Sequence, residues 1–169
     1  MQKFDFRHLL PVDFSPSSKV WIYQSNRLFS INESLQIEAL LQDFTENWNS
    51  HGTKVKGHAD LLFGQFILLM ADETATGVSG CSTDSSVRLI KHIEKLWNVN
   101  LFDRLLLAFV IRDKIQVLPL SQLQYALQNN FIDSGTIYFN NLVQDKNELE
   151  QNWMIPVNQS WLSSRLQLT

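Results

Sequence analysis

The sequence predicts an α+β fold, in which a mainly antiparallel sheet carries helices on one of its faces. Up to residue 111, segments with strand character and segments of helical period follow one another as strand, helix, strand, strand, helix, strand. Apolar residues make up 44% of the chain and charged residues 18%, which is typical of a folded globular domain. The 169 residues suffice for one domain with a C-terminal extension.

This order of elements is that of the split βαβ, or ferredoxin-like, topology, in which both helices cover the same face of the sheet. We therefore expect a single α+β domain over residues 1–169. Its core would span about residues 19–112, and a C-terminal α/β extension would span about residues 113–169.

The first strand is predicted at Lys19–Gln24, where the residues alternate and β-forming side chains are frequent. A helix is predicted over residues 30–50, because Ser30 and Glu33 have the spacing of a capping box. Its apolar residues recur at helical spacing and form one stripe: Ile37, Leu41, Phe44 and Trp48. Gly52 follows as a signal that ends the helix.

Two strands are predicted within residues 54–72, with Gly64 in the turn between them. The second of these, Phe66–Met70, is wholly apolar and should be central in the sheet. A second helix is predicted from about Asp84 to Asn98, with one buried stripe of apolar residues. The segment Leu105–Ile111 then reads as the fourth strand of the core.

The remainder of the chain is predicted to extend or cap the core. We expect a short strand at Ile115–Leu118, a short helix at Ser121–Asn129 and a last strand at Thr136–Phe139. In the C-terminal segment, Trp153 and Trp161 should dock on the body of the domain, since large aromatic side chains bury much surface.

Charge and cysteine content narrow the function classes. The net charge is −3, and the 14 Lys and Arg residues are scattered rather than gathered into the basic face that nucleic-acid binding requires. The single cysteine cannot form an intramolecular disulfide, which fits a reducing compartment. No apolar run approaches the ~20 residues of a membrane span. We expect a cytoplasmic protein with no nucleic-acid or membrane partner.

One segment has the composition of a site: residues 77–86 (GVSGCSTDSS). Gly80 permits unusual backbone conformations, and the next helix directs free N–H groups and its positive dipole end at this loop. An anion would find donors there, and the thiolate of Cys81 would be favoured. The candidate ligand-binding residues are Gly80, Ser82, Thr83, Asp84 and Ser85. The same composition is also what any junction between a loop and a helix requires, with the cysteine as a small buried residue.

A cysteine nucleophile needs a base, which is usually a histidine. In the split βαβ topology, His51 follows the first helix at the same sheet edge as Cys81, so His51 is the candidate base. A histidine after a helix is, alternatively, a C-terminal residue that interacts with the helix dipole. Charged residues expected at this edge are Lys54, Lys56, Asp72, Glu73 and Arg112.

A second polar group is expected at the opposite sheet edge. Arg27 ends the first strand, and Asp103 and Arg104 precede the fourth. Arg27 and Asp103 would form a structural ion pair, or Arg27 and Arg104 would clamp an anion. The chain has no Gly-Lys pair of a P-loop, no HExxH and no CxxC, so neither a metal nor a cofactor is expected.

Four segments resemble a small family of uncharacterised bacterial proteins, and the likeness covers nearly the whole chain. They are Val20–Arg27, Ser79–Val87, Leu101–Arg104 and Ile137–Val143. Members of that family often carry the label "ABC transporter ATPase". The resemblance implies that a site lies in these segments, and it assigns no catalytic role. Since no phosphate-binding loop is present, ATP hydrolysis is not expected.

Three functions remain open. The leading hypothesis is a non-enzymatic domain that binds a small anionic ligand or a protein partner through residues 77–86. The second is a cysteine-dependent enzyme with Cys81 as nucleophile and His51 as base. The third is a structural or interaction subunit, such as a homodimer formed through an exposed sheet face or edge.

Overall fold

The computed structural model describes residues 3–168, with the exception of the side chain of Cys81. The described residues form four α-helices and nine strands in three antiparallel sheets, which confirms the α+β prediction. The chain divides into two compact units. The first contains the residues up to Phe102 together with Gln144–Glu150, and the second contains Asp103–Val143 together with the residues from Gln151 onward.

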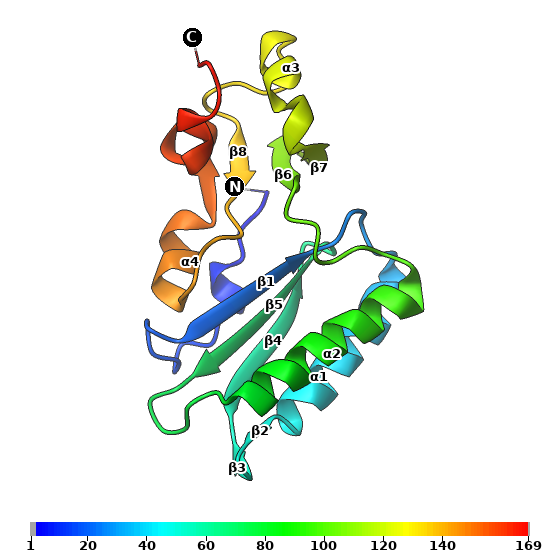
Figure 1. Cartoon of the computed structure of the whole chain (residues 1–169), viewed down its shortest axis with the longest axis vertical. Helices are drawn as coiled ribbons and strands as arrows, with labels where there is room; N and C mark the ends of the chain where they lie inside the picture. The colour runs from blue at the N-terminus through cyan, green and yellow to red at the C-terminus, as the bar shows by residue number, and fades with distance from the viewer. Residues whose placement is uncertain (1–2, 169) are drawn as a thin grey trace. The chain divides into compact units, whose positions relative to one another are not determined.

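The first unit is built on a three-stranded sheet in the order β1-β5-β4, as Figure 1 shows. These strands are β1 (Lys19–Gln24), β5 (Phe66–Asp72) and β4 (Lys56–Leu62). Every residue of β5 is buried, so the apolar run is the central strand, as predicted. The turn between β4 and β5 places Phe63 and Gly64 at φ values of 55° and 64°, which is the left-handed region that a two-residue hairpin turn needs.

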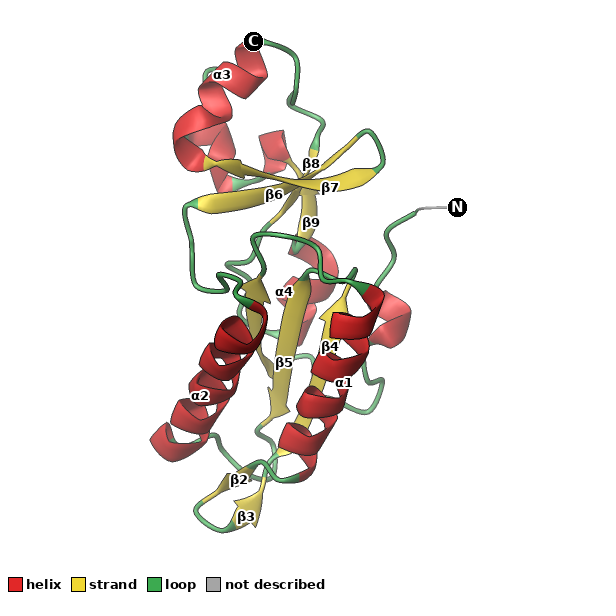
Figure 2. Cartoon of the chain, turned by 90° about the vertical axis from the view of Figure 1, so that its right-hand side faces the viewer, coloured by secondary structure: helices red, strands yellow, loops and turns green. Residues whose placement is uncertain are grey.

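Helices α1 (Ile31–Glu46) and α2 (Gly80–Trp97) lie side by side on one face of this sheet (Figures 1 and 2). Their buried side chains pack with those of β5 in one cluster that includes Ile37, Leu41, Ile67, Leu69, Ile90 and Ile93. At the start of α1, Ser30 Oγ accepts a hydrogen bond from the Glu33 amide, and the Glu33 carboxylate accepts one from the Ser30 amide. The predicted capping box is therefore confirmed.

Helix α1 ends at Glu46, which is earlier than predicted. The next residues form a hairpin of β2 (Asn49–Ser50) and β3 (Thr53–Lys54), and Gly52 shapes its turn rather than the end of the helix. The physical reason is Trp48, which is 1% exposed and lies over β4. The chain must leave the helical path to bury this ring.

The predicted four-stranded split βαβ core is wrong in its fourth strand. The first three predicted strands pair as that topology requires, but the outer edge of β1 is occupied by the distant segment Gln144–Asp145. The Val20 amide donates to the Gln144 carbonyl at 3.0 Å, and Lys19 forms a bridge with Asp145. This segment precedes α4 (Lys146–Asn152), and it lies beside the first two residues of β1, at the edge where the split βαβ topology would place its fourth strand.

The strand expected as the fourth, β6 (Leu106–Ile111), belongs to the second unit instead. There it pairs with β7 (Lys114–Pro119) and β8 (Ile137–Phe139), and the sheet has the order β7-β6-β8-β9. The core expected over residues 19–112 therefore ends at Phe102, and the extension begins with β6. Whether the two units act as one domain stays a prediction.

The second unit buries β6 against the C-terminal part of the chain, and it contains α3 (Leu123–Gln128) and β9 (Met154–Pro156). Its core includes Leu107, Phe109, Leu123, Tyr138, Val157 and Leu162. The ring of Trp153 lies 5.2 Å from that of Phe139, and Trp161 Nε1 donates to the Tyr138 hydroxyl at 3.1 Å. Both tryptophans dock on β8, as predicted for the C-terminal segment.

The contact between Gly57 and Trp48 gives a test of this packing. A Cβ atom at Gly57 would lie 2.6 Å from Cε3 of Trp48, which is too close for two carbon atoms. We expect Gly57→Ala to lower the free energy of unfolding by about 1–3 kcal/mol, because the buried ring must shift.

The matched control is Gly77→Ala, since a Cβ at Gly77 would meet no atom within 4 Å. That change should alter the free energy of unfolding by no more than ~0.5 kcal/mol. Urea denaturation of both variants measures the difference, and equal stabilities would contradict the close packing of Trp48 on β4.

Candidate functional site

The segment predicted as a binding loop is in large part helix. Helix α2 begins at Gly80 instead of Asp84, and its N-cap is Ser79. Ser79 Oγ accepts from the Ser82 amide at 3.2 Å, and the Ser79 amide donates to Ser82 Oγ at 3.4 Å. Ser82, Thr83, Asp84 and Ser85 therefore lie within the first turns of the helix, and none of them is the N-cap.

The hydroxyl groups of this segment bond to the protein's own backbone. Ser82 Oγ donates to the Asn49 carbonyl at 2.9 Å, and Ser82 is only 1% exposed. Thr83 Oγ1 donates to the Ser79 carbonyl at 3.0 Å, and Ser85 Oγ donates to the Ser82 carbonyl at 2.8 Å. Each of these three hydroxyls therefore donates its hydrogen to the backbone inside the fold, and their role in ligand binding stays a prediction.

The charge of the segment also disfavours an anion. Residues 73–86 contain Glu73 and Asp84 but neither lysine nor arginine. Gly80 is exposed, and a Cβ there would meet nothing within 4 Å, so its backbone is open to solvent. An anion would find the helix dipole at this place but no cationic side chain of the segment.

The start of α2 lies against the hairpin β2–β3, as the predicted placement at one sheet edge requires. Trp48 Nε1 donates to the Ser82 carbonyl at 3.1 Å, beside the bond from Ser82 Oγ to Asn49. The C-cap of α1 is Asn47, so His51 is an exposed residue at the hairpin tip rather than at the helix end. Within the described residues, His51 has no hydrogen bond that would orient its ring as a base.

The role of Cys81 as a nucleophile stays a prediction, because its side chain lies outside the described part of the structure. Its backbone lies in the first turn of α2. Of the charged residues expected at the same edge, Arg112 is exposed in the β6–β7 turn and belongs to the second unit.

Asp72, at the end of β5, fixes the start of the loop before α2. Its carboxylate accepts hydrogen bonds from the Ser15 amide at 3.0 Å, the Thr74 amide at 3.0 Å and the Thr74 hydroxyl at 2.8 Å. Lys56 Nζ lies 3.5 Å away. The amide of Ser15, followed by the two Thr74 groups, lowers the pKa of Asp72 to about 2. The carboxylate, only 3% exposed, is therefore a structural acceptor.

Glu73 ties the middle of the same loop to its beginning. Its carboxylate accepts from the Val78 amide at 2.8 Å and forms an ion pair with Lys19 at 3.1 Å. The neighbouring carboxylates of Asp72 and Glu73 therefore have separate partners. Their role in holding the loop was not predicted, although an Asp two residues before a Thr is a signal for a local turn.

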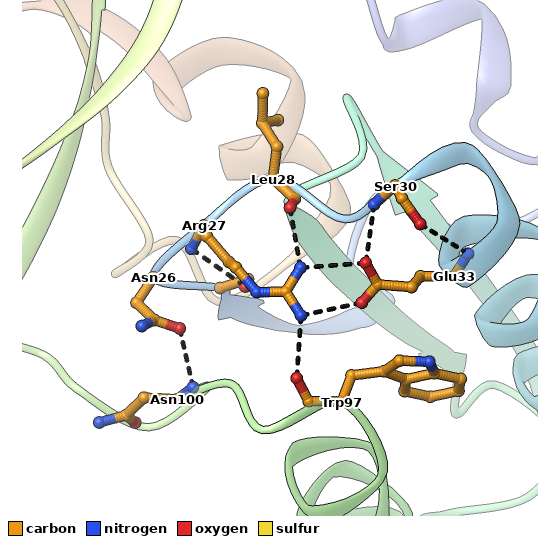
Figure 3. Close-up of polar contacts among 8 residues, drawn as sticks. Asn26, Arg27, Leu28, Ser30, Glu33, Trp97 and Asn100 are labelled. Carbon is orange, nitrogen blue, oxygen red and sulfur yellow. Dashed lines mark hydrogen bonds and ion pairs between the residues drawn. The ribbon is translucent and has the colours of Figure 1, made fainter.

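The second predicted polar group forms no anion clamp. Arg27 makes a bidentate pair with Glu33, at 3.1 and 2.9 Å, and also donates to the carbonyls of Leu28 and Trp97 (Figure 3). The hydrogen bond from Arg27 is the largest cause that lowers the pKa of Glu33 to about 2. The alternative pair with Asp103 is also absent, since the Asp103 carboxylate accepts from the Leu105 amide.

Arg27 instead ties the loop after β1 to the end of α2. The same connection contains a reciprocal pair. The Asn100 amide donates to Asn26 Oδ1 (Figure 3), and the Asn26 amide donates to the Asn100 carbonyl. Arg104 is exposed and belongs to the second unit. The sequence signal for this cluster was the capping box. It places the carboxylate of Glu33 at the start of α1, within reach of Arg27, which lies just before the helix.

His58 on β4 lies in a largely buried environment. Its Nε2 is buried without a hydrogen-bond partner, and its ring contacts Phe14 edge-on, with centroids 6.3 Å apart. Burial lowers the pKa of His58, and the nearby Asp60 opposes that shift. Within the described residues, no acid or nucleophile forms a hydrogen bond with its Nε2.

Comparison with protein-family models, with curated proteins and with solved structures returned no match. The resemblance to the bacterial family therefore stays a prediction. Over the described residues, no three His, Cys, Asp or Glu side chains gather closely enough to hold a metal ion. In the same part of the chain, no helix has the length and apolar character to cross a bilayer.

The two arginines of the predicted clamp should differ in their effect on stability. We expect Arg27→Ala to lower the free energy of unfolding by roughly 1–2 kcal/mol, because Glu33 and the Trp97 carbonyl both lose a partner, an effect that partial exposure moderates. Arg104→Ala, at an exposed position, should stay within ~0.5 kcal/mol of the wild type. Equal effects in chemical denaturation would contradict a stabilising role for the Arg27 hydrogen bonds drawn in Figure 3.

The buried His58 should make stability depend on pH. Its pKa is lowered from 6.5 in the folded protein, so below about 6.5 the unfolded chain binds the proton more readily. The free energy of unfolding should therefore fall as the pH drops from about 7.5 to 5.5, and His58→Gln should flatten this slope. His92→Gln, at an exposed position of α2, is the control. An unchanged slope in His58→Gln would refute the assignment.

Proposed function

We propose that this protein is a non-enzymatic, cytoplasmic binding domain that recognises another protein through the segment from Thr74 to Gly80. The observation that carries the proposal is a loop that is held at both ends and open between them. Asp72 accepts from the Thr74 amide at one end, Glu73 accepts from the Val78 amide towards the other end, and the Ser79 capping box there begins α2. Residues Thr74, Ala75, Gly77 and Gly80 are exposed.

A loop of this kind suits recognition, because its hydrogen bonds hold its backbone in the free protein and little further ordering is needed when a partner binds. Binding by a flexible segment loses conformational entropy, and a segment fixed in the free protein avoids most of that loss. Loops on a rigid scaffold commonly carry binding functions for this reason. Here the scaffold is the buried strand β5, which precedes the loop.

The chemistry of the segment and of the residues beside it favours a protein over a small anion. The hydroxyls of Ser82, Thr83 and Ser85, which follow the segment, bond internally, and the only charged side chains in residues 73–86 are acidic. Small exposed residues such as Ala75 and Gly77 allow a partner's backbone to approach closely. An enzymatic role for Cys81 has no oriented histidine to support it among the described residues.

Site-specific photo-crosslinking in cells tests the proposal. A photoreactive residue at Gly77 should give discrete adducts, and the same residue at the exposed Gln116 of β7 should not. The added change Asp72→Asn should weaken the Gly77 adducts, because it releases the start of the loop. Identical adduct patterns at both positions, or none at Gly77, would contradict the proposal.

Titration with inorganic phosphate separates the protein partner from the anion. We expect no saturable change in the amide NMR shifts of residues 77–86 up to ~10 mM phosphate, a range that covers weak, millimolar binding. Saturable shifts at the Gly80 and Cys81 amides would show that the helix N-terminus binds an anion, and the protein-partner proposal would be abandoned.

A further inference from the structure

The face of the first sheet that points away from α1 and α2 is covered in part by the chain that precedes β1. In β4, Ala59 packs in the cluster beneath the two helices. Because successive residues of a strand point to opposite faces, the neighbouring His58 points away from the helices. There its ring meets the ring of Phe14 edge-on. We call residues 13–18, which end where β1 begins, the strap.

Hydrogen bonds hold the strap on both sides of Phe14 along the chain. Lys56 Nζ donates to the Asp13 carbonyl at 2.8 Å, and the Ser15 amide donates to the Asp72 carboxylate at 3.0 Å. Phe14 itself is 8% exposed, and Lys56 Nζ lies 4.9 Å from the centroid of its ring. Since Phe14 lies directly between these two bonded residues, a displacement of its ring pulls on both hydrogen bonds.

One carboxylate connects the strap to the loop from Thr74 to Gly80. Asp72 Oδ2 accepts from the Ser15 amide, while Asp72 Oδ1 accepts from the amide and the hydroxyl of Thr74. The bond from Ser15 is the largest cause of the low pKa of Asp72. A buried carboxylate that loses this donor is costly, so it moves towards water. That movement takes Oδ1 away from Thr74 and frees the start of the loop.

The acids nearest to His58 already have other partners. Lys56 and Asp60 flank His58 on its own face of β4, and the register places Asp72 of β5 opposite Lys56. Lys56 Nζ lies 3.4 Å from a carboxylate oxygen of Asp13 on the strap and 3.5 Å from one of Asp72. Asp60 is the acid of this group that is not paired with Lys56, and its carboxylate accepts from a backbone amide of β4.

The positive charges and the burial of the ring favour neutral His58. Lys56 lies on the same face, and Lys146 Nζ donates to the Phe14 carbonyl at 3.2 Å. Within the described residues, His58 Nε2 is buried and has no hydrogen-bond partner. Burial lowers the pKa of His58 below 6.5, and the attraction of Asp60 opposes this shift without cancelling it. Neutral His58 is therefore the form that fits beneath the strap.

We propose that protonation of His58 releases the strap and thereby loosens the start of the loop from Thr74 to Gly80. A protonated ring needs water, which reaches it when Phe14 moves away. In that released state the pKa of His58 returns towards 6.5, so the released state binds the proton more tightly than the closed state. A fall in pH below 6.5 therefore increases the released population. The consequence, weaker recognition of a partner in acid, rests on the function proposed above for the loop.

Amide hydrogen exchange of the full chain, followed by NMR, tests the switch. The Ser15 and Thr74 amides report on it directly, because both donate to Asp72. Their protection factors, corrected for the intrinsic pH dependence of exchange, should fall at least about fivefold from about pH 7.5 to about pH 5.5. The Val78 amide, which donates to Glu73 towards the other end of the loop, should keep its protection.

Three variants separate this switch from a general loss of stability. His58→Gln, which does not titrate in this range, should remove the pH dependence at Ser15 and Thr74. His92→Gln, at an exposed position of α2, should respond like the wild type. Phe14→Ala should lower the protection of both amides already at about pH 7.5, because the strap loses its buried ring.

Three results would overturn the proposal. They are constant protection of Ser15 and Thr74 in the wild type, an equal fall in His58→Gln, and a fall of the same size at Val78. The exchange experiment uses the protein without a partner, whereas the photo-crosslinking experiment depends on one. Failure of the switch therefore leaves the recognition role of the loop untouched, and an absence of adducts at Gly77 leaves the switch untouched.

Discussion

The complete burial of β5 is the constraint on which the first unit depends. The strand pairs with β1 on one side and β4 on the other, and its apolar side chains fill the space beneath α1 and α2. Strand β5 ends at Asp72, whose carboxylate is also buried. A buried carboxylate without donors is costly, so the chain supplies Ser15 and Thr74 as donors. Those bonds position the loop that leads to α2.

Trp48 connects this sheet to the start of α2. Its ring lies on Gly57, where only a residue without a side chain fits, and its Nε1 bonds to the Ser82 carbonyl. The hydroxyl of Ser82 then reaches Asn49. These contacts hold the start of α2 in place, and they also direct the polar groups of Ser82 into the protein. Most polar groups of a segment that has the composition of a ligand site are therefore used for packing, which is why we propose the loop from Thr74 to Gly80 as the recognition surface.

The sequence by itself determined the elements that depend on neighbouring residues. The capping box of Ser30 and Glu33, the turn at Gly64 and the central place of Phe66–Met70 all follow from local spacing and composition. Tertiary structure alone decided which of several consecutive capping residues begins α2, which acid pairs with Arg27, and which sheet receives β6. Gln144–Asp145 pairs with the start of the outer edge of β1. No local sequence pattern encodes which of several distant segments will pair with that edge. Strand pairing and side-chain partners between such segments are set by the packing of the whole core.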